Sequence, residues 1–241
     1  MDIRYIQLDL ASFKSIRSAA SQFASECDRL DTLILNAGVM ALPPGKTEDG
    51  FEIQFGTNHV GHFLLTKLLL PTLRRTADVI NSDVRVISVS SMAWQMSPFS
   101  VPSALSLMTS TEALCAENTW TCYGVSKAAN IIFAAELARR YPEITSVSIH
   151  PGVILTGLYA TYNSTNPIVK LGLQLVSPFV TGEESGVLNH LWAAGIAKEK
   201  LTSGEYYTPV GVKGGRNPFA HDAEAGEKLW DWTNEHVSRS E

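Results

Sequence analysis

The sequence predicts one α/β domain, spanning residues 1–241, in which a doubly wound and mostly parallel sheet is covered by helices on both faces. Short runs rich in β-branched and aliphatic residues alternate with longer segments of helical periodicity, an order typical of parallel sheets with right-handed crossovers. The chain has 241 residues, 45% of them hydrophobic, which is enough for one large core. No internal repeat or linker divides it.

The first part of the chain predicts two strands with a helix between them. Residues 4–8 alternate between apolar and polar side chains and are expected to form a strand. Ser12 is a candidate N-cap for an amphipathic helix that ends near Cys27. A buried strand is expected at residues 32–35, and it leads into Asn36-Ala37-Gly38.

The middle of the chain predicts two long helices around a third strand. The first helix is expected over residues 51–70, with Pro71 at its end. Residues 84–89 have the β-branched content of a strand, and a loop of about 30 residues is expected after Ser90-Ser91. The second long helix is expected over residues 122–141.

The last part predicts two further strands and two capped helices. Strands are expected at residues 146–149 and 205–207. Thr181 and Glu184 form a capping-box pattern, and Asp222 is a candidate cap for a final helix.

Composition excludes several classes of function. With 19 basic and 24 acidic residues, the net charge is -5, so the electropositive surface of a nucleic-acid binder is not expected. Cys27, Cys115 and Cys122 include no C-x-x-C pair, which favours a reducing compartment and a cytoplasmic protein. No apolar run approaches the ~20 residues of a transmembrane helix.

Metal and hydrolase signatures are also missing from the sequence. The six histidines form neither H-x-x-x-H nor H-E-x-x-H, so no metal site is expected. No serine lies in a G-x-S-x-G elbow. Met92, Met96 and Met108 follow the third strand, where they could line an apolar pocket, although core packing is the preferred interpretation.

Candidate ligand-binding residues follow the expected strands. In open parallel sheets, ligands bind beyond the carboxyl ends of the strands. Those positions hold Asp9, Asn36-Ala37-Gly38, Ser90-Ser91 and Pro151-Gly152. Each alone is compatible with an ordinary loop, but their shared position favours a site where a flat ligand approaches the backbone closely.

Tyr123-x-x-x-Lys127 is the candidate catalytic pair. Residues four apart share one face of a helix, and an ammonium near a phenol lowers the phenol's pKa toward the working pH. The alternative is a surface aromatic residue with a lysine one turn away. Ser91 could polarise a carbonyl oxygen, and Asn58, in an otherwise apolar segment, is expected to find a buried partner.

Six motifs together resemble one family. They are Asp9-Leu10, Asn36-Ala37-Gly38, Asn58 within the run 55–63, Val89-Ser90-Ser91, Tyr123-x-x-x-Lys127 and the run 151–156. With these motifs the chain resembles the short-chain dehydrogenases/reductases, which are NAD(P)-dependent oxidoreductases on a Rossmann fold. Residues 50–70 resemble the retinol-dehydrogenase-like branch, and residues 204–211 and 228–232 are similar to fungal members, many of them in secondary-metabolite pathways.

The resemblance implies a role for each motif. Tyr123 would be the acid/base residue, Lys127 would lower its pKa and hold the nicotinamide ribose, Ser91 would position the substrate oxygen, and Asn58 would support a proton relay. The reaction would interconvert an alcohol and its carbonyl with NADP or NAD. The residues implied in cofactor binding are Asp9, Asn36, Ala37, Gly38, Tyr123, Lys127, Val153, Ile154 and Thr156.

One part of the family pattern is missing. None of the 17 glycines precedes Gly38, so the T-G-x-x-x-G-x-G turn that receives the pyrophosphate is absent. The chain opens at the family's third strand, and the expected fold therefore lacks the first βαβ unit, roughly 30 residues or more. Two interpretations of this absence are compatible with the sequence: it is an N-terminally truncated form of a longer protein, or the chain is a catalytically impaired pseudoenzyme or interaction protein.

The resemblance also bears on substrate and assembly. Residues 158–180 would cover the substrate, and because they are apolar with Lys170 as the one charge, a small lipophilic alcohol or carbonyl compound is expected. An ordinary packed helix would show the same composition. Dimers and tetramers are common in the family, so a homo-oligomer is compatible with it.

Overall fold

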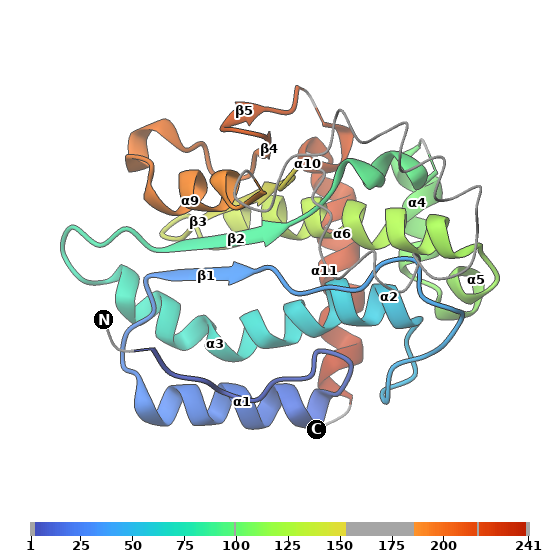
Figure 1. Cartoon of the computed structure of the whole chain (residues 1–241), viewed down its shortest axis with the longest axis horizontal. Coiled ribbons are helices and arrows are strands. Elements are labelled where there is room, and N and C mark those ends of the chain that lie inside the picture. The colour runs from blue at the N-terminus through green and yellow to red at the C-terminus, as the bar shows by residue number, and fades with distance from the viewer. Residues whose placement is uncertain (1–2, 99, 153–185, 216, 240–241) are drawn as a thin grey trace.

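Five strands form one sheet in the computed structural model, which describes residues 3–98, 100–152, 186–215 and 217–239. The strands follow the order β1-β2-β3-β4-β5, and neighbours are parallel except β4 and β5 (Figure 1). Their bounds are β1 Thr32–Leu35, β2 Arg85–Val89, β3 Thr145–Ile149, β4 Tyr206–Thr208 and β5 Val212–Lys213. The predicted parallel α/β sheet is confirmed.

Helices cover both faces of the central strands, as a doubly wound sheet requires. Val86 of β2 belongs to the larger core, which α3 (Gly61–Ala77) and α6 (Thr119–Arg140) complete on one face. Ile87 points the other way, into a smaller core shared with β3 and α9 (Leu188–Gly195). Alternate residues of β2 therefore face two separate cores.

The prediction of a strand at residues 4–8 is wrong. Residues 4–8 are extended but pair with no strand, and Tyr5 is 85% exposed. This segment runs along α1 (Phe13–Glu26), on the helical side of the molecule (Figure 1). A strand needs a hydrogen-bonding neighbour, and β1 pairs only with β2 within the described ranges. The cap predicted at Ser12 is confirmed, because its side chain accepts the N–H of Ser15.

The helix expected over residues 51–70 is divided and extends further. It consists of α2 (Ile53–Phe55), a π-helical turn η1 (Gly56–Val60) and α3. Pro71 does not end it, since α3 continues to Ala77. Pro71 lies on the exposed side of α3, where water can replace the backbone hydrogen bond that a proline removes.

The long loop expected after Ser91 contains short helices. They are a 3-10 turn η2 (Met92–Met96), α4 (Val101–Met108) and α5 (Thr111–Cys115). Serines cap α4 and α5, which explains how helices this short begin where they do.

Two C-terminal helices pack beside α6. They are α10 (Pro218–His221) and α11 (Ala223–Ser238), and a short turn, η5 (Lys198–Lys200), precedes β4. The cap predicted at Asp222 is confirmed by its bond to the N–H of Ala225. The capping box predicted at Thr181 and Glu184 lies outside the described residues.

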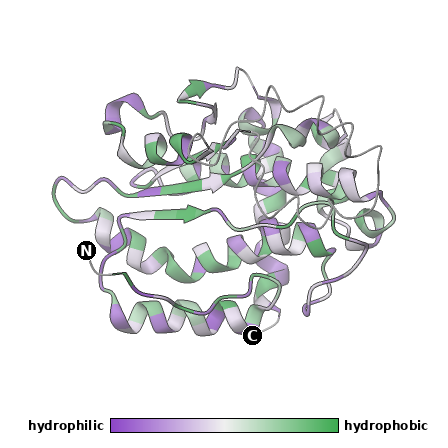
Figure 2. Ribbon diagram, viewed as in Figure 1, coloured by the Kyte–Doolittle hydropathy of each residue, from purple (hydrophilic) through white to green (hydrophobic). Residues whose placement is uncertain are grey.

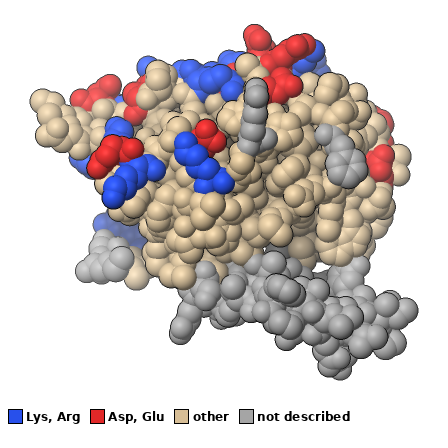
Figure 3. Space-filling model, turned by 90° about the horizontal axis from the view of Figure 1, so that it is seen from above, with Lys and Arg blue, Asp and Glu red and all other residues tan. Residues whose placement is uncertain are grey.

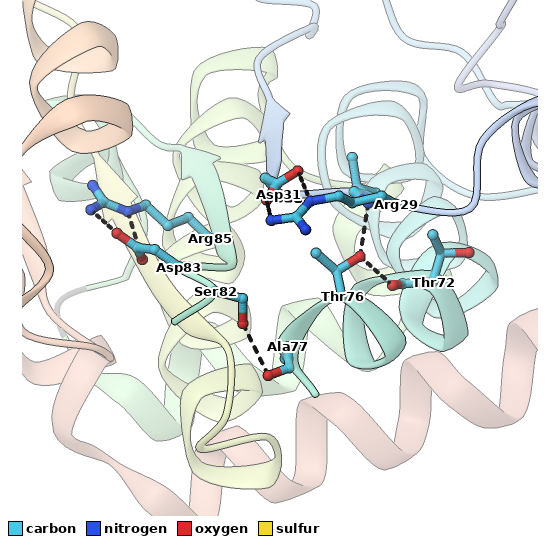
Figure 4. Close-up of polar contacts among 9 residues, drawn as sticks. Arg29, Asp31, Thr72, Thr76, Ala77, Ser82, Asp83 and Arg85 are labelled. Carbon is cyan, nitrogen blue, oxygen red and sulfur yellow. Dashed lines mark hydrogen bonds and ion pairs between the residues drawn. The ribbon is translucent and has the colours of Figure 1, made fainter. Parts of the chain in front are cut away.

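Charged pairs fix the amino ends of β1 and β2 (Figure 4). Arg29 binds Asp31 before β1, and Arg85 at the start of β2 binds Asp83. The buried Arg85 guanidinium also donates to the carbonyls of Ala193 and Ile196 at the end of α9. These contacts lie at the opposite end of the strands from the predicted ligand-binding residues.

The distribution of hydropathy and charge agrees with this layering. The strands are mostly hydrophobic, whereas the helices carry one hydrophobic and one hydrophilic side (Figure 2). Ile34 of β1 is 40% exposed although its neighbour Ile87 is fully buried, so the β1 face opposite α3 is uncovered by the described residues. Acidic and basic side chains are mixed on the face drawn in Figure 3. Among the described helices, none is long and apolar enough to span a membrane.

Candidate active site

A cavity of about 380 Å³ opens at the carboxyl ends of β1, β2 and β3. Its walls combine the residues that follow these strands with the first turns of α6 and with η2. The lining residues are Asn36, Ala37, Gly38, Val39, Met40, Val89, Ser90, Ser91, Ala93, Met96, Trp120, Tyr123, Lys127, Pro151, Gly152 and His190. Most of the predicted site residues that the structure describes therefore meet in one place.

Tyr123 and Lys127 lie one turn apart near the start of α6. The helix begins where the Asn118 side chain accepts the N–H groups of Trp120 and Thr121. Lys127 Nζ is 5.8 Å from the centre of the Tyr123 ring, and both side chains are buried. Burial lowers the pKa of Lys127 to about 8, because a charged ammonium is costly away from water.

Lys127 is held at the end of β2. Its Nζ donates to the backbone oxygen of Val89 at 3.0 Å, and Asn130 Nδ2 donates to the same oxygen at 3.1 Å. Ser90 Oγ donates to the backbone oxygen of Lys127 at 2.7 Å. Sequence reasoning missed Asn130, although a polar residue inside an apolar run three positions after Lys127 was a usable signal.

Asn58 is fully buried and its side-chain amide is hydrogen-bonded, as expected. Its Oδ1 accepts the N–H of Val39 at 2.8 Å, and its Nδ2 donates to the carbonyl of Val39 and to Ser126 Oγ, both at 2.9 Å. A Cβ on Gly38 would lie 2.8 Å from Asn58 Oδ1 and 3.5 Å from Lys127 Nζ. Only glycine lets the segment after β1 come this close to both side chains.

Ser91 lines the cavity beyond the end of β2 and caps η2. Its Oγ accepts the N–H of Ala93 at 3.1 Å. A Cβ on Gly124 would lie 2.6 Å from the backbone nitrogen of Ser97, so α6 packs directly on η2. Ser91 and Tyr123 both line the cavity.

Some predicted residues lie elsewhere. The Asp9 carboxylate accepts the N–H of Ala11 at the entry to α1 and does not line the cavity. Val153, Ile154 and Thr156 lie outside the described residues. Of the three methionines, Met96 lines the cavity, Met108 is buried in the core, and Met92 is half exposed.

The chain is similar to known oxidoreductases along most of its length. A family model described as short chain dehydrogenase matches residues 1–103. An uncharacterized oxidoreductase of Schizosaccharomyces pombe is 37% identical over 96% of this chain and 68% of the relative. Human retinol dehydrogenase 14 is also 37% identical, over 93% of this chain and 64% of the relative. The chain therefore spans about two thirds of the length of these relatives.

Solved structures agree on the fold. A protein from Mycobacterium paratuberculosis has 30% identity and a TM-score of 0.65, covering 96% of this chain and 74% of its own. An NADPH-bound carbonyl reductase from chicken fatty liver, 22% identical, has a TM-score of 0.55 and covers 84% and 73% of the two chains. The chain belongs to the short-chain dehydrogenase/reductase family of NAD(P)-dependent oxidoreductases.

The residues present fit the nicotinamide and ribose part of the family's cofactor. Gly38 lines the cavity and brings the segment after β1 close to Asn58 and Lys127, and a buried ammonium with a phenol beside it borders the same cavity. A cavity of about 380 Å³ is within the range that small ligands occupy.

Proposed function

We propose that the protein catalyses the NAD(P)-dependent interconversion of an alcohol and a carbonyl compound, with Tyr123 as the proton donor and acceptor. The observation that carries this proposal is the arrangement of three side chains around one cavity. Tyr123 and Lys127 share a face of α6, and Ser91 borders the same cavity from the end of β2.

Each side chain has a distinct part in this chemistry. The Lys127 ammonium favours the phenolate form of Tyr123, so the phenol can give a proton to a carbonyl oxygen and take it back from an alcohol. The Ser91 hydroxyl donates a hydrogen bond to the same substrate oxygen. The bound nicotinamide supplies or accepts the hydride.

Cofactor contacts follow from the cavity walls. Asn36, Ala37 and Gly38 would lie along the dinucleotide, and Lys127 would hold its ribose. Asp9, Val153, Ile154 and Thr156 complete the proposed contacts on the strength of the family resemblance.

A lipophilic substrate is supported by the outer wall of the cavity. Met40, Ala93, Met96 and Trp120 line it, and their side chains offer apolar and aromatic surface.

The proposal also includes a role in fungal secondary metabolism, assembly as a homo-oligomer and a cytoplasmic location. The free Cys27, Cys115 and Cys122 support the reducing compartment.

Replacing Tyr123 by Phe tests the proposal, because it removes only a hydroxyl. NAD(P)H oxidation with a panel of lipophilic carbonyl compounds should fall by about 10²- to 10⁴-fold, with the urea unfolding midpoint nearly unchanged. Tyr141→Phe, which removes a hydroxyl at the far end of α6, is the matched control. Activity retained in Tyr123→Phe would refute the assignment.

The alternative function is that of a catalytically impaired pseudoenzyme or interaction protein. Titration of NADPH and NADH, followed by tryptophan fluorescence, separates the two functions. Trp120 lines the cavity and reports occupancy, so Trp120→Phe should remove most of the signal. Micromolar binding supports the oxidoreductase, whereas no quenching at millimolar dinucleotide supports the pseudoenzyme.

A further inference from the structure

The backbone oxygen of Val89 accepts two side-chain hydrogen bonds at the end of β2. Lys127 Nζ donates at 3.0 Å and Asn130 Nδ2 at 3.1 Å. All three residues are at least nine-tenths buried. A carbonyl has two lone pairs, so both bonds form together.

Lys127 is the charged one of the two donors, and it also borders the cavity. Among the described residues, the titratable groups that face it are Tyr123 from its own helix and His62 from α3. Its Nζ borders the cavity as well as Val89. The ammonium can therefore exchange the carbonyl for an oxygen of a molecule bound in the cavity.

Such an exchange would be costly if Lys127 were the sole donor to Val89. A buried carbonyl that loses its hydrogen bond carries the full desolvation penalty of the group. Asn130 removes that cost, because its amide remains on the Val89 oxygen when Lys127 leaves. The Ser90 hydroxyl, bonded to the Lys127 carbonyl, keeps the helix in place at the same time.

We infer that Asn130 is a positioning residue that keeps the Val89 carbonyl hydrogen-bonded, so that Lys127 is free to bind the vicinal hydroxyl groups of a ribose in the cavity. The inference rests on the proposed function for the identity of the ligand. Asn130 itself lies behind Lys127 and does not line the cavity.

Two substitutions of Asn130 test this role. Asn130→Leu removes the amide with little change in volume, and Asn130→Asp replaces the donor by an anion of the same shape. Both should weaken NADPH binding on the order of tenfold, measured by tryptophan fluorescence, because departure of Lys127 then leaves the carbonyl without a donor. Asn189→Leu is the matched control, since Asn189 Nδ2 donates to the carbonyl of His150 after β3.

A second readout needs no bound dinucleotide. The pKa of Lys127, measured by NMR after reductive ¹³C-methylation and assigned with Lys127→Met, should rise in Asn130→Leu. The pKa rises because the Val89 carbonyl then accepts a hydrogen bond from the Lys127 ammonium only. The pKa should rise further in Asn130→Asp and stay unchanged in Asn189→Leu.

The outcomes separate this inference from the proposed function. An unchanged Lys127 pKa in folded Asn130→Leu overturns the inference, whether or not the protein binds a dinucleotide. Equal loss of binding in Asn189→Leu and Asn130→Leu also overturns it, because the effect would then be general destabilisation. Absence of NADPH binding in the unsubstituted protein would instead count against the proposed function.

Discussion

The Asn58 side chain forms two hydrogen bonds with the backbone of Val39, one as acceptor and one as donor. The Asn58 side chain accepts the N–H of Val39 at 2.8 Å and donates to its carbonyl at 2.9 Å. This pair joins the π-helical turn η1 to the segment that follows β1, and the third bond of Asn58, to Ser126, extends the connection to α6. One buried amide thus connects η1 to two segments that line the cavity, the one after β1 and the first turns of α6.

Asn58→Leu should lower the free energy of unfolding by about 2–4 kcal/mol. It removes three hydrogen bonds and leaves both polar groups of the Val39 backbone without their partner. Urea unfolding followed by circular dichroism measures the change. Ser126→Ala, which removes only one of the three bonds, should cost about 1 kcal/mol, and an equal cost for both variants would contradict the central role of Asn58.

The strands and the main site residues could be predicted from the sequence because their signals are local. Residues 32–35 and 84–89 are apolar runs, and Tyr123 and Lys127 are spaced by one helical turn. Parallel topology then brings the segments after the strands to one edge, which is why Gly38 and Ser91 border the same cavity.

The errors concern features that depend on distant parts of the chain. Residues 4–8 have a strand-like pattern, but a pattern cannot supply the neighbouring strand that pairing requires. Pro71 was expected to end a helix, yet its effect depends on whether the freed carbonyl faces water. Asn130 acts through Val89, a contact that joins positions far apart in sequence.

Gly38→Ala should damage the site although it adds a single methyl group. The new Cβ would lie 2.8 Å from Asn58 Oδ1, so either the segment after β1 or the Asn58 amide must move. We expect a loss of about 1–3 kcal/mol in unfolding free energy and weaker dinucleotide binding. In Gly45→Ala the nearest atom would be 3.8 Å away, so this matched variant should retain both properties.

Lys127 should make the protein more stable as the pH rises from 8 to 10. Burial lowers the pKa of Lys127 to about 8, whereas the unfolded chain holds this proton up to about 10.4. Between these values the unfolded state binds more protons, so the free energy of unfolding increases with pH, by an amount on the order of 3 kcal/mol.

Urea unfolding at several pH values checks this dependence. The difference between the unsubstituted protein and Lys127→Met isolates the contribution of Lys127 from other groups that titrate in the same range. Parallel pH profiles for the two proteins would contradict the prediction.

His62 should make the protein less stable as the pH falls from 6.5 to 4. Its imidazole is buried in α3 with Nδ1 3.0 Å from the backbone oxygen of Asn58, and burial, followed by the nearby charge of Lys127, lowers its pKa to about 4. The unfolded chain takes up this proton near pH 6.5, so the stability present above that pH is lost on acidification.

His62→Asn keeps a donor near the position of Nδ1 but cannot be protonated. The loss of unfolding free energy between pH 7 and pH 4.5 should therefore be smaller in this variant, by about 2 kcal/mol. His221→Asn, at a half-exposed position, is the matched control and should retain the acid sensitivity of the unsubstituted protein. If His62→Asn loses stability as steeply as that control, the buried imidazole does not govern the acid response.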